Sequence, residues 1–255
     1  MNFKIFIINL DRSVERYQHA VAQLAAWPDL PVERLSAADG SRMSEEELNQ
    51  YYLLTLNQQH YHKLLKPGEK GCYISHIRCW QQIVAQQLDF ALILEDDFVV
   101  QCDLPALVNE ISQLKEQWHY IKLAMPNKAQ PVIQRKALGA GFSLVHYKKH
   151  PVSTVAQFVS LAGAQLLLDK AVPFYRPVDV MLQYHFALGI KALGISPQPF
   201  CPEHSFDSNI YTRDKADKKQ WLFFKNRLSY FFQSQFFNLR TYGLKSFLKA
   251  RKLSE

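Results

Sequence analysis

Residues Phe90–Asp97, with the sequence FALILEDD, join five apolar residues directly to three acids. An unbroken apolar run of this length is typical of a strand that is covered on both faces of a sheet. Carboxylates at the end of such a strand are costly unless a cation completes the site, and their hard oxygens suit Mg²⁺ or Mn²⁺. In an extended chain Glu95 and Asp97 point to one side and Asp96 to the other. We expect Glu95 and Asp97 to share a divalent cation, although spacing alone leaves a solvated acidic turn equally open.

The segments around this strand alternate between strand and helix patterns. Further strands are predicted at Phe3–Asn9, Val32–Leu35, Tyr120–Ala124 and Gln157–Leu161. Helices are predicted from Asp11 to just before Pro28, from a capping box at Ser44 through Leu54, and over Cys72–Ile83, Gly163–Ala171 and Val178–Leu188. This alternation predicts an α/β domain with a mainly parallel sheet, in which ligands bind at the carboxyl ends of the strands.

The composition fits one packed core rather than a membrane-spanning or disulfide-stapled chain. The 255 residues are 48% hydrophobic and 21% charged, and no apolar stretch approaches the roughly 20 residues of a membrane span. The apolar run at the N-terminus stops at Asp11 and lacks the features of a secretory signal, so we expect a cytosolic chain. The four cysteines form no CxxC pair, which favours reduced thiols and argues against a zinc site.

Positive charge is concentrated at the C-terminal end. Residues 215–255 hold ten Lys or Arg and two acids, a net charge of +8 against +7 for the whole chain, so residues 1–214 carry −1. We therefore predict a catalytic domain over 1–214 and a basic, aromatic helical tail over 215–255. Because the charge is confined to the tail and no nucleic-acid-binding signature is present, we do not expect nucleic acid as a partner.

Apolar residues of the tail recur at helical spacing beside the cations. They are Phe224, Leu228, Phe231, Phe232, Phe236 and Leu239. An apolar stripe flanked by positive charge is typical of a helix that lies in an anionic membrane interface. The same pattern also fits a helix that packs back on the catalytic domain, or a dimer contact.

The segment Asn9–Arg16 follows the first strand, where α/β domains bind nucleotides. Arg12 and Arg16 lie four residues apart near a helix N-terminus, a place that favours phosphate. An ordinary amphipathic helix with Glu15 paired to a neighbouring arginine explains the same residues. The absence of GxGxxG and of a P-loop argues against a dinucleotide enzyme or a P-loop ATPase.

Two further polar residues have an ordinary structural explanation on local evidence. His76 lies on the apolar stripe of its predicted helix, where a lone histidine is usually a core residue. Asp179 lies in the first turn of a predicted helix, where the helix dipole favours an acid.

Six segments, in the same order along residues 3–210, resemble glycosyltransferase family 25. This family includes lipooligosaccharide sugar transferases and is related to the galactosyltransferase domains of collagen-modifying enzymes. The matching segments are Ile7–Arg12 with Glu15 and Arg16, Ala38–Gly40, Gly68–His76, Ala91–Asp97, Ala162–Ala164 with Leu166 and Leu167, and Pro177–Asp179.

The resemblance implies a GT-A fold, a Rossmann-like single domain with a nucleotide-sugar donor and Mn²⁺ or Mg²⁺ at the acidic motif. It places Asn9, Leu10, Arg12, Arg16, Asp39, Gly40, His76 and Glu95 at the UDP-sugar. It assigns the metal to Glu95 and Asp97, with His204 as a further ligand; a surface loop histidine is the alternative for His204. The chain departs from the family pattern at Gln157–Leu161, which bears on the choice of donor sugar.

The implied function is metal-dependent, inverting transfer of a hexose from a UDP-sugar to a lipooligosaccharide or lipopolysaccharide core. The family's commonest activity favours galactose. Inversion needs one base at the acceptor hydroxyl, for which we expect Asp179 first and Asp96 second. With a lipid-linked acceptor, the tail would hold the protein on the cytoplasmic face of the inner membrane. The alternative function is a catalytically silent relative that binds sugar or nucleotide.

Overall fold

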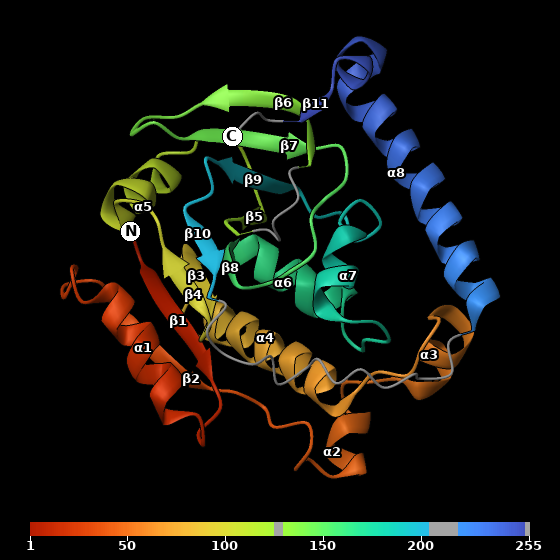
Figure 1. Cartoon of the computed structure of the whole chain (residues 1–255), viewed down its shortest axis with the longest axis horizontal. Coiled ribbons are helices and arrows are strands. Elements are labelled where there is room, and N and C mark those ends of the chain that lie inside the picture. The colour runs from red at the N-terminus through yellow and green to blue at the C-terminus, as the bar shows by residue number, and fades with distance from the viewer. Residues whose placement is uncertain (125–129, 204–218, 253–255) are drawn as a thin grey trace.

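The computed structural model describes residues 1–124, 130–203 and 219–252 (Figure 1). The strands are β1 (Phe3–Asn9), β2 (Val32–Ser36), β3 (Phe90–Glu95), β4 (Phe98–Val100), β5 (Tyr120–Lys122), β6 (Pro131–Ala137), β7 (Ser143–Tyr147), β8 (Ala156–Ser160), β9 (Ala192–Ser196), β10 (Phe200–Pro202) and β11 (Arg251–Lys252). The helices are α1 (Val14–Leu24), α2 (Glu45–Asn49), α3 (Leu54–His60), α4 (Pro67–Ala85), α5 (Leu104–Ser112), α6 (Leu161–Lys170), α7 (Val178–Gln183) and α8 (Gln220–Leu248). The predicted α/β class is confirmed.

A mixed nine-stranded sheet runs through the molecule in the order β11-β6-β7-β9-β5-β8-β3-β1-β2. The strands β2, β1 and β3 pair in parallel, as do β5 and β9. Between these two groups β8 runs antiparallel to β3 and to β5, and β7 runs antiparallel to β6 and β9. Parallel pairing therefore dominates only near the N-terminal strands, which end together at one edge of the sheet.

Both faces of the central strands are covered, which explains their unbroken apolar sequences. In β1, Phe6 and Ile8 join a core cluster with residues of α4 and α6. Ile5 and Ile7 point the other way and join a second cluster with residues of α1 and α5. Side chains alternate across a strand, so a strand that is buried on both faces needs apolar residues at every position. In Figure 1, α4 and α6 lie to the right of β1 and β3, and α1 and α5 lie to their left.

The predicted helix from Ser44 through Leu54 is wrong, because the chain forms two short helices there. The capping box at Ser44 is present at the start of α2. The backbone between α2 and α3 instead bonds to the segment before α7: Phe174 N donates to Tyr51 O, and Leu53 N donates to Phe174 O. Because Tyr51 O and Leu53 N form these bonds, α2 does not continue into α3 as one helix.

Other predicted bounds also shift. The helix predicted over Val178–Leu188 ends at Gln183. The strands β4, β6, β7, β9, β10 and β11 and the helix α5 were not predicted. The boundary predicted near Asp214 lies outside the described residues.

The described part of the predicted tail forms α8, which lies along one side of the domain and leads into the sheet edge (Figure 1). β11 pairs antiparallel with β6. Helices long and apolar enough to cross a membrane are absent from the described residues.

Close backbone contact explains the small residue at Gly163. A Cβ atom on Gly163 would lie 2.0 Å from the carbonyl oxygen of His119, so α6 approaches the start of β5 only because that atom is missing. We expect Gly163→Ala to lower the free energy of unfolding by about 1–3 kcal/mol through overpacking. Urea denaturation measures this, with Gln165→Ala, an exposed change on the same helix, as the control. Equal stability of the Gly163→Ala variant and the natural protein would contradict the contact.

Candidate functional site

A cavity of about 400 Å³ opens where β1 and β3 end. It is lined by Ile8, Leu10, Arg12, Arg16, Ala37, Ala38, Asp39, Gly40, Ser41, Lys66, Pro67, Gly68, Cys72, Ser75, His76, Glu95, Asp96 and Asp97. Nine of the residues predicted for the site thus line one cavity although they come from four separate stretches of sequence. Asn9 is outside the lining but bonds to Asp96, Asp179 is also outside the lining, and His204 lies outside the described residues.

Asp96 is anchored on the α1 side of the cavity. Arg16 Nε donates to Asp96 Oδ1 over 2.8 Å, and a second guanidinium nitrogen pairs with the same oxygen. Asn9 Nδ2 donates to Asp96 Oδ2 over 2.7 Å and also to Ser13 O. Arg34 in turn donates to Asn9 Oδ1. Both oxygens of this buried carboxylate are therefore engaged, and the ends of β1 and β3 and the start of α1 are tied together.

Glu95 points to the opposite side, toward α4. Its Oε1 accepts from Thr154 Oγ1 over 2.6 Å and lies 3.2 Å from His76 Nε2. On the far side of the imidazole, Gln157 Nε2 lies 2.9 Å from His76 Nδ1, so a tautomer with the proton on Nε2 satisfies both contacts. Burial by itself raises the pKa of Glu95, but the bonds from His76 and Thr154 outweigh it and the pKa lies below its ordinary value. Glu95 is thus a stable carboxylate.

Asp97 lies in the bend after β3 and is less completely compensated. Its Oδ2 is 3.4 Å from an Arg16 nitrogen, while its buried Oδ1 has no hydrogen-bond partner among the described residues. Burial, together with the charges of Glu95 and Asp96, raises the pKa of Asp97 to about 7, and Arg16 acts in the opposite direction. An orphaned carboxylate oxygen beside a second carboxylate is a donor set that suits a hard divalent cation.

A second possible donor set lines the same cavity. One ligand atom each of Cys72, His76 and Glu95 fall within 4.8 Å of one another. Burial, reinforced by the charge of Glu95, raises the pKa of the Cys72 thiol well above its usual value. Thiolate and imidazole are softer ligands than carboxylate oxygens, so this set suits Mn²⁺ or Mg²⁺ less well than the carboxylates of Glu95 and Asp97 do.

Two glycines hold the opposite wall together. A Cβ on Gly40 would lie 2.0 Å from Pro67 O, and one on Gly71 would lie 2.4 Å from Ala38 O. The loop after β2 can therefore touch the first turn of α4 only with glycine at both positions. Arg12 pairs with Asp39 in this loop, which brings the segment before α1 to the same wall. The start of α4 faces the cavity, and a helix N-terminus favours anions such as phosphate, here without an amide hydrogen at Pro67.

Asp179 is joined to the acidic cluster through two neighbouring residues. Ser153 N donates to Asp179 Oδ2 over 3.3 Å, and Thr154 donates to Glu95 as described above. The buried amine of Lys122 donates to Ser153 O. Burial lowers the pKa of Lys122 to about 8, although the carboxylates of Asp179 and Glu95 act against this shift. Asp179 thus borders the cluster without lining the cavity.

Sequence reasoning missed several residues that build the site. Thr154 and Ser153 lie in a loop and gave no signal. Lys122 did give a signal, because it interrupts the apolar run of the predicted strand Tyr120–Ala124. A charged side chain that is buried in a strand needs polar partners. Lys66 gave no signal of a binding site, because the Pro-Gly pair that follows it indicates only a turn.

The comparison with known sequences identifies the chain. Residues 2–182 match the sequence profile described as Glycosyltransferase family 25 (LPS biosynthesis protein). The chain belongs to glycosyltransferase family 25. This match includes every segment on which the resemblance rested, from the end of β1 to Asp179.

Curated relatives of this family 25 chain align with most of its length, but at low sequence identity. A Glycosyltransferase 25 family member of Drosophila pseudoobscura pseudoobscura is 28% identical over 85% of the chain and 37% of its own length. Procollagen galactosyltransferase 2 of Mus musculus is 25% identical over 86% of the chain and 38% of its own length. A Bos taurus relative, 28% identical over 86% of the chain and 40% of its own, is named Probable inactive glycosyltransferase 25 family member 3. The chain thus spans about two fifths of the length of these relatives.

Two solved structures that match this family 25 chain do so at low sequence identity. A glycosyltransferase involved in glycosylation of the major capsid of PBCV-1 has a TM-score of 0.44 at 10% identity, covering 81% of this chain and 95% of that one. A Drosophila beta-1,4-galactosyltransferase 7 mutant, in complex with manganese, UDP-Gal and xylobiose, has a TM-score of 0.45 at 9% identity, covering 87% and 79%. The family assignment therefore rests on the sequence.

The burial of Asp97 leads to a prediction for the metal-free protein. The pKa of Asp97 is higher in the folded protein than the value of about 4 for an unfolded aspartate. The free energy of unfolding therefore falls as the pH rises from about 4 toward 7. Asp97→Asn removes this loss, so its gain in unfolding free energy over the natural protein should be larger at pH 8 than at pH 5. Urea denaturation in EDTA measures both values, with the exposed change Asp29→Asn as the control. A gain that does not grow with pH would contradict the uncompensated charge.

Proposed function

We propose that this chain transfers a hexose from a UDP-sugar to a glycan acceptor. One observation carries the proposal: three acids at the end of β3 share a cavity with Arg12, Arg16 and the start of α4. The cationic side chains and the N-terminus of α4 suit the oxygens of a diphosphate. The carboxylates suit the cation that accompanies a diphosphate in many transfer reactions. Membership of glycosyltransferase family 25 supports the same reaction.

The residues fit a divalent cation, for which we propose Glu95 and Asp97 as ligands and Mn²⁺ or Mg²⁺ as the ion. When bound, such a cation would neutralise negative charge on the departing nucleoside diphosphate. Both oxygens of Asp96 accept hydrogen bonds from Arg16 and Asn9, so we propose that Asp96 holds Arg16 in the cavity wall and we favour Asp179 over Asp96 as the base. His76 fixes the carboxylate of Glu95.

For the acceptor proton we propose Asp179 as the base. Its side chain is partly exposed, and it borders the acidic cluster through Ser153 and Thr154. An inverting transfer needs one such group, which takes the proton from the acceptor hydroxyl while that oxygen attacks the anomeric carbon. Lys122, buried next to Asp179, would hold the Ser153 carbonyl and so position this base.

The finer identity of donor and acceptor is also a proposal. Galactose is favoured because curated relatives are named procollagen galactosyltransferases. A lipooligosaccharide or lipopolysaccharide core is favoured as acceptor by the family description, LPS biosynthesis protein. Gln157 belongs to the segment in which this chain departs from the family pattern. Its Nε2 contacts His76 Nδ1, and its buried Oε1 has no hydrogen-bond partner among the described residues.

A second candidate is a silent relative that binds nucleotide or sugar without turnover. The observation that favours it is the name of the Bos taurus relative, which is 28% identical and called probably inactive.

Release of UDP separates the two candidates. The protein is incubated with UDP-galactose, UDP-glucose and UDP-N-acetylglucosamine, with Mn²⁺ or with EDTA, and free UDP is measured. We expect slow release from UDP-galactose that requires Mn²⁺, because a transferase also passes the sugar to water at a low rate. Release from none of the donors, with intact binding of UDP, would favour the silent relative.

Replacement of the proposed base tests the division of roles. We expect Asp179→Asn to lower turnover by about 10²–10⁴-fold while donor affinity stays within a few-fold, because the amide cannot accept the proton. Kinetics with a sugar acceptor and a UDP titration supply the two values. Asp169→Asn, an exposed change on α6, is the control. Near-normal turnover of Asp179→Asn would rule out Asp179 as the base.

Replacement of a proposed cation ligand gives the opposite pattern. We expect Asp97→Ala to weaken the Mn²⁺-dependent binding of UDP by roughly 10- to 100-fold or more, since a group that holds the ion directly is lost. Calorimetric titration of UDP with Mn²⁺ and with EDTA measures this. An unchanged difference between the two titrations would remove Asp97 from the metal site.

A further inference from the structure

Helix α8 packs against the domain with one of its sides only. On this inner side Asn226 Nδ2 donates to His60 O, and Asn238 Nδ2 donates to Lys148 O. Further along, the ring of Tyr230 contacts Tyr184, and the ring of Phe237 contacts His185. The alternative that the tail packs back on the catalytic domain is therefore correct for this side.

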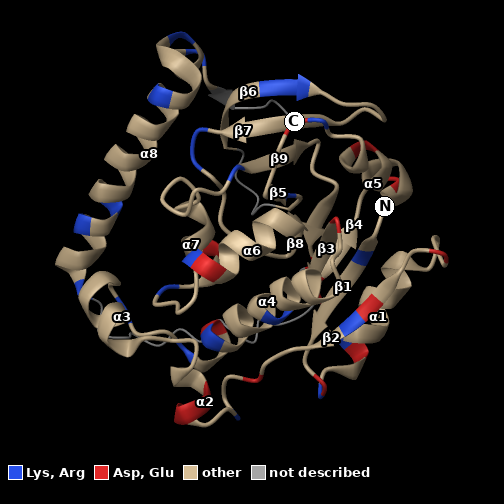
Figure 2. Cartoon of the chain, turned by 180° about the vertical axis from the view of Figure 1, so that it is seen from behind, with Lys and Arg blue, Asp and Glu red and all other residues tan. Residues whose placement is uncertain are grey.

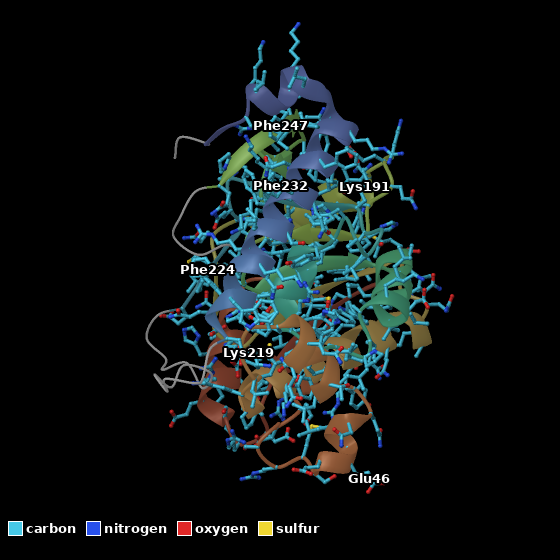
Figure 3. The ribbon with its side chains drawn as sticks, turned by 90° about the vertical axis from the view of Figure 1, so that its right-hand side faces the viewer. Glu46, Lys191, Lys219, Phe224, Phe232 and Phe247 are labelled. Carbon is cyan, nitrogen blue, oxygen red and sulfur yellow. The ribbon has the colours of Figure 1, made fainter. Side chains whose placement is uncertain are left out.

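The outer side of α8 exposes large apolar side chains to solvent. Ten of the sixteen exposed large apolar residues in the described part of the chain belong to this helix. The outward face consists of Trp221, Phe224, Leu228, Phe231, Phe232, Phe236 and Leu239, spaced mainly by three or four residues. Phe224 and Phe236 are 63% and 67% exposed. Figure 3 views the molecule from this side, with α8 in front. Exposed apolar patches of this kind usually mark an interaction surface.

The charge beside this outward face has a single sign. The cations Lys225, Arg227, Arg240 and Lys245 lie along α8, and the helix contains no Asp or Glu from Gln220 to Leu248. Figure 2 shows α8 with blue positions and no red ones. Lys225 also lies over the ring of Trp221, with its Nζ 5.6 Å from the ring centroid. Aromatic rings and cations thus occupy the same surface.

We propose that the outward face of α8 docks on an anionic lipid bilayer. Aromatic and leucine side chains can enter the boundary between headgroups and acyl chains, while the flanking Lys and Arg contact anionic headgroups. A second copy of the chain fits this face less well, because two such helices face to face would bring cations against cations with no acid between them. The bilayer supplies both the apolar layer and the opposite charge.

This docking surface is independent of the proposed glycosyl transfer. No residue of the outward face lines the cavity. Vesicle binding can therefore be measured without donor, acceptor or metal, and its failure would leave the proposed reaction untouched.

Vesicle flotation of the full chain tests the proposal. The vesicles are phosphatidylcholine alone, and phosphatidylcholine with phosphatidylglycerol at a ratio of three to one. We expect the natural protein to float with the anionic vesicles and to stay below with the neutral ones, and added salt to reduce flotation. The combined change Phe224→Gln, Leu228→Gln and Phe231→Gln should reduce the bound fraction at least tenfold. The matched control replaces two exposed apolar residues elsewhere, Val21→Gln and Leu54→Gln, and should float like the natural protein.

A second variant guards against misfolding of the first. Lys225→Glu with Arg227→Glu leaves the apolar face intact and should also release the protein from anionic vesicles. The proposal is overturned if the natural protein ignores anionic vesicles or if both variants float as it does. It is also overturned if light scattering shows a dimer that only the glutamine variant dissociates, since the face would then hold a second copy.

Discussion

The structure depends on compensating three consecutive carboxylates at the end of a buried strand. Glu95, Asp96 and Asp97 follow five apolar residues into a region of low dielectric, where an unpaired charge costs several kilocalories per mole. The fold meets this constraint separately for each acid. Asp96 is neutralised by Arg16, Glu95 is bonded from the α4 side, and Asp97 retains an oxygen without a partner among the described residues. The residual negative charge suits a cation, and the proposed metal site rests on it.

This unequal compensation links the stability of the protein to its proposed function. A carboxylate whose pKa is raised to about 7 destabilises the protein near neutral pH when no cation is bound, and a bound divalent cation would offset that destabilisation. The same cation would draw a diphosphate toward Arg16 and the first turn of α4. The two close glycine contacts, at Gly40 and Gly71, keep these elements near enough to act on one ligand.

Sequence reasoning recovered the elements whose pattern is local. The strand before Glu95 is apolar because both faces are buried, and the capping box at Ser44 starts a helix, so both could be predicted. The split between α2 and α3 could not, because it arises from backbone bonds to Phe174, more than a hundred residues away. Loop residues such as Thr154 were missed for the same reason, since only the fold brings them to Glu95. The outward face of α8 was visible in the sequence as a periodic apolar stripe. The sequence did not indicate which side of the helix packs on the domain.

The most direct test of the central claim is the position of manganese in a crystal of the protein soaked with Mn²⁺ and UDP. Anomalous diffraction locates the metal without reference to activity. We predict a single peak shared by the carboxylates of Glu95 and Asp97, with the diphosphate of UDP beside Arg16. An empty acidic cluster in a crystal that has bound UDP would contradict the account, as would a peak held by Cys72 and His76 without Asp97.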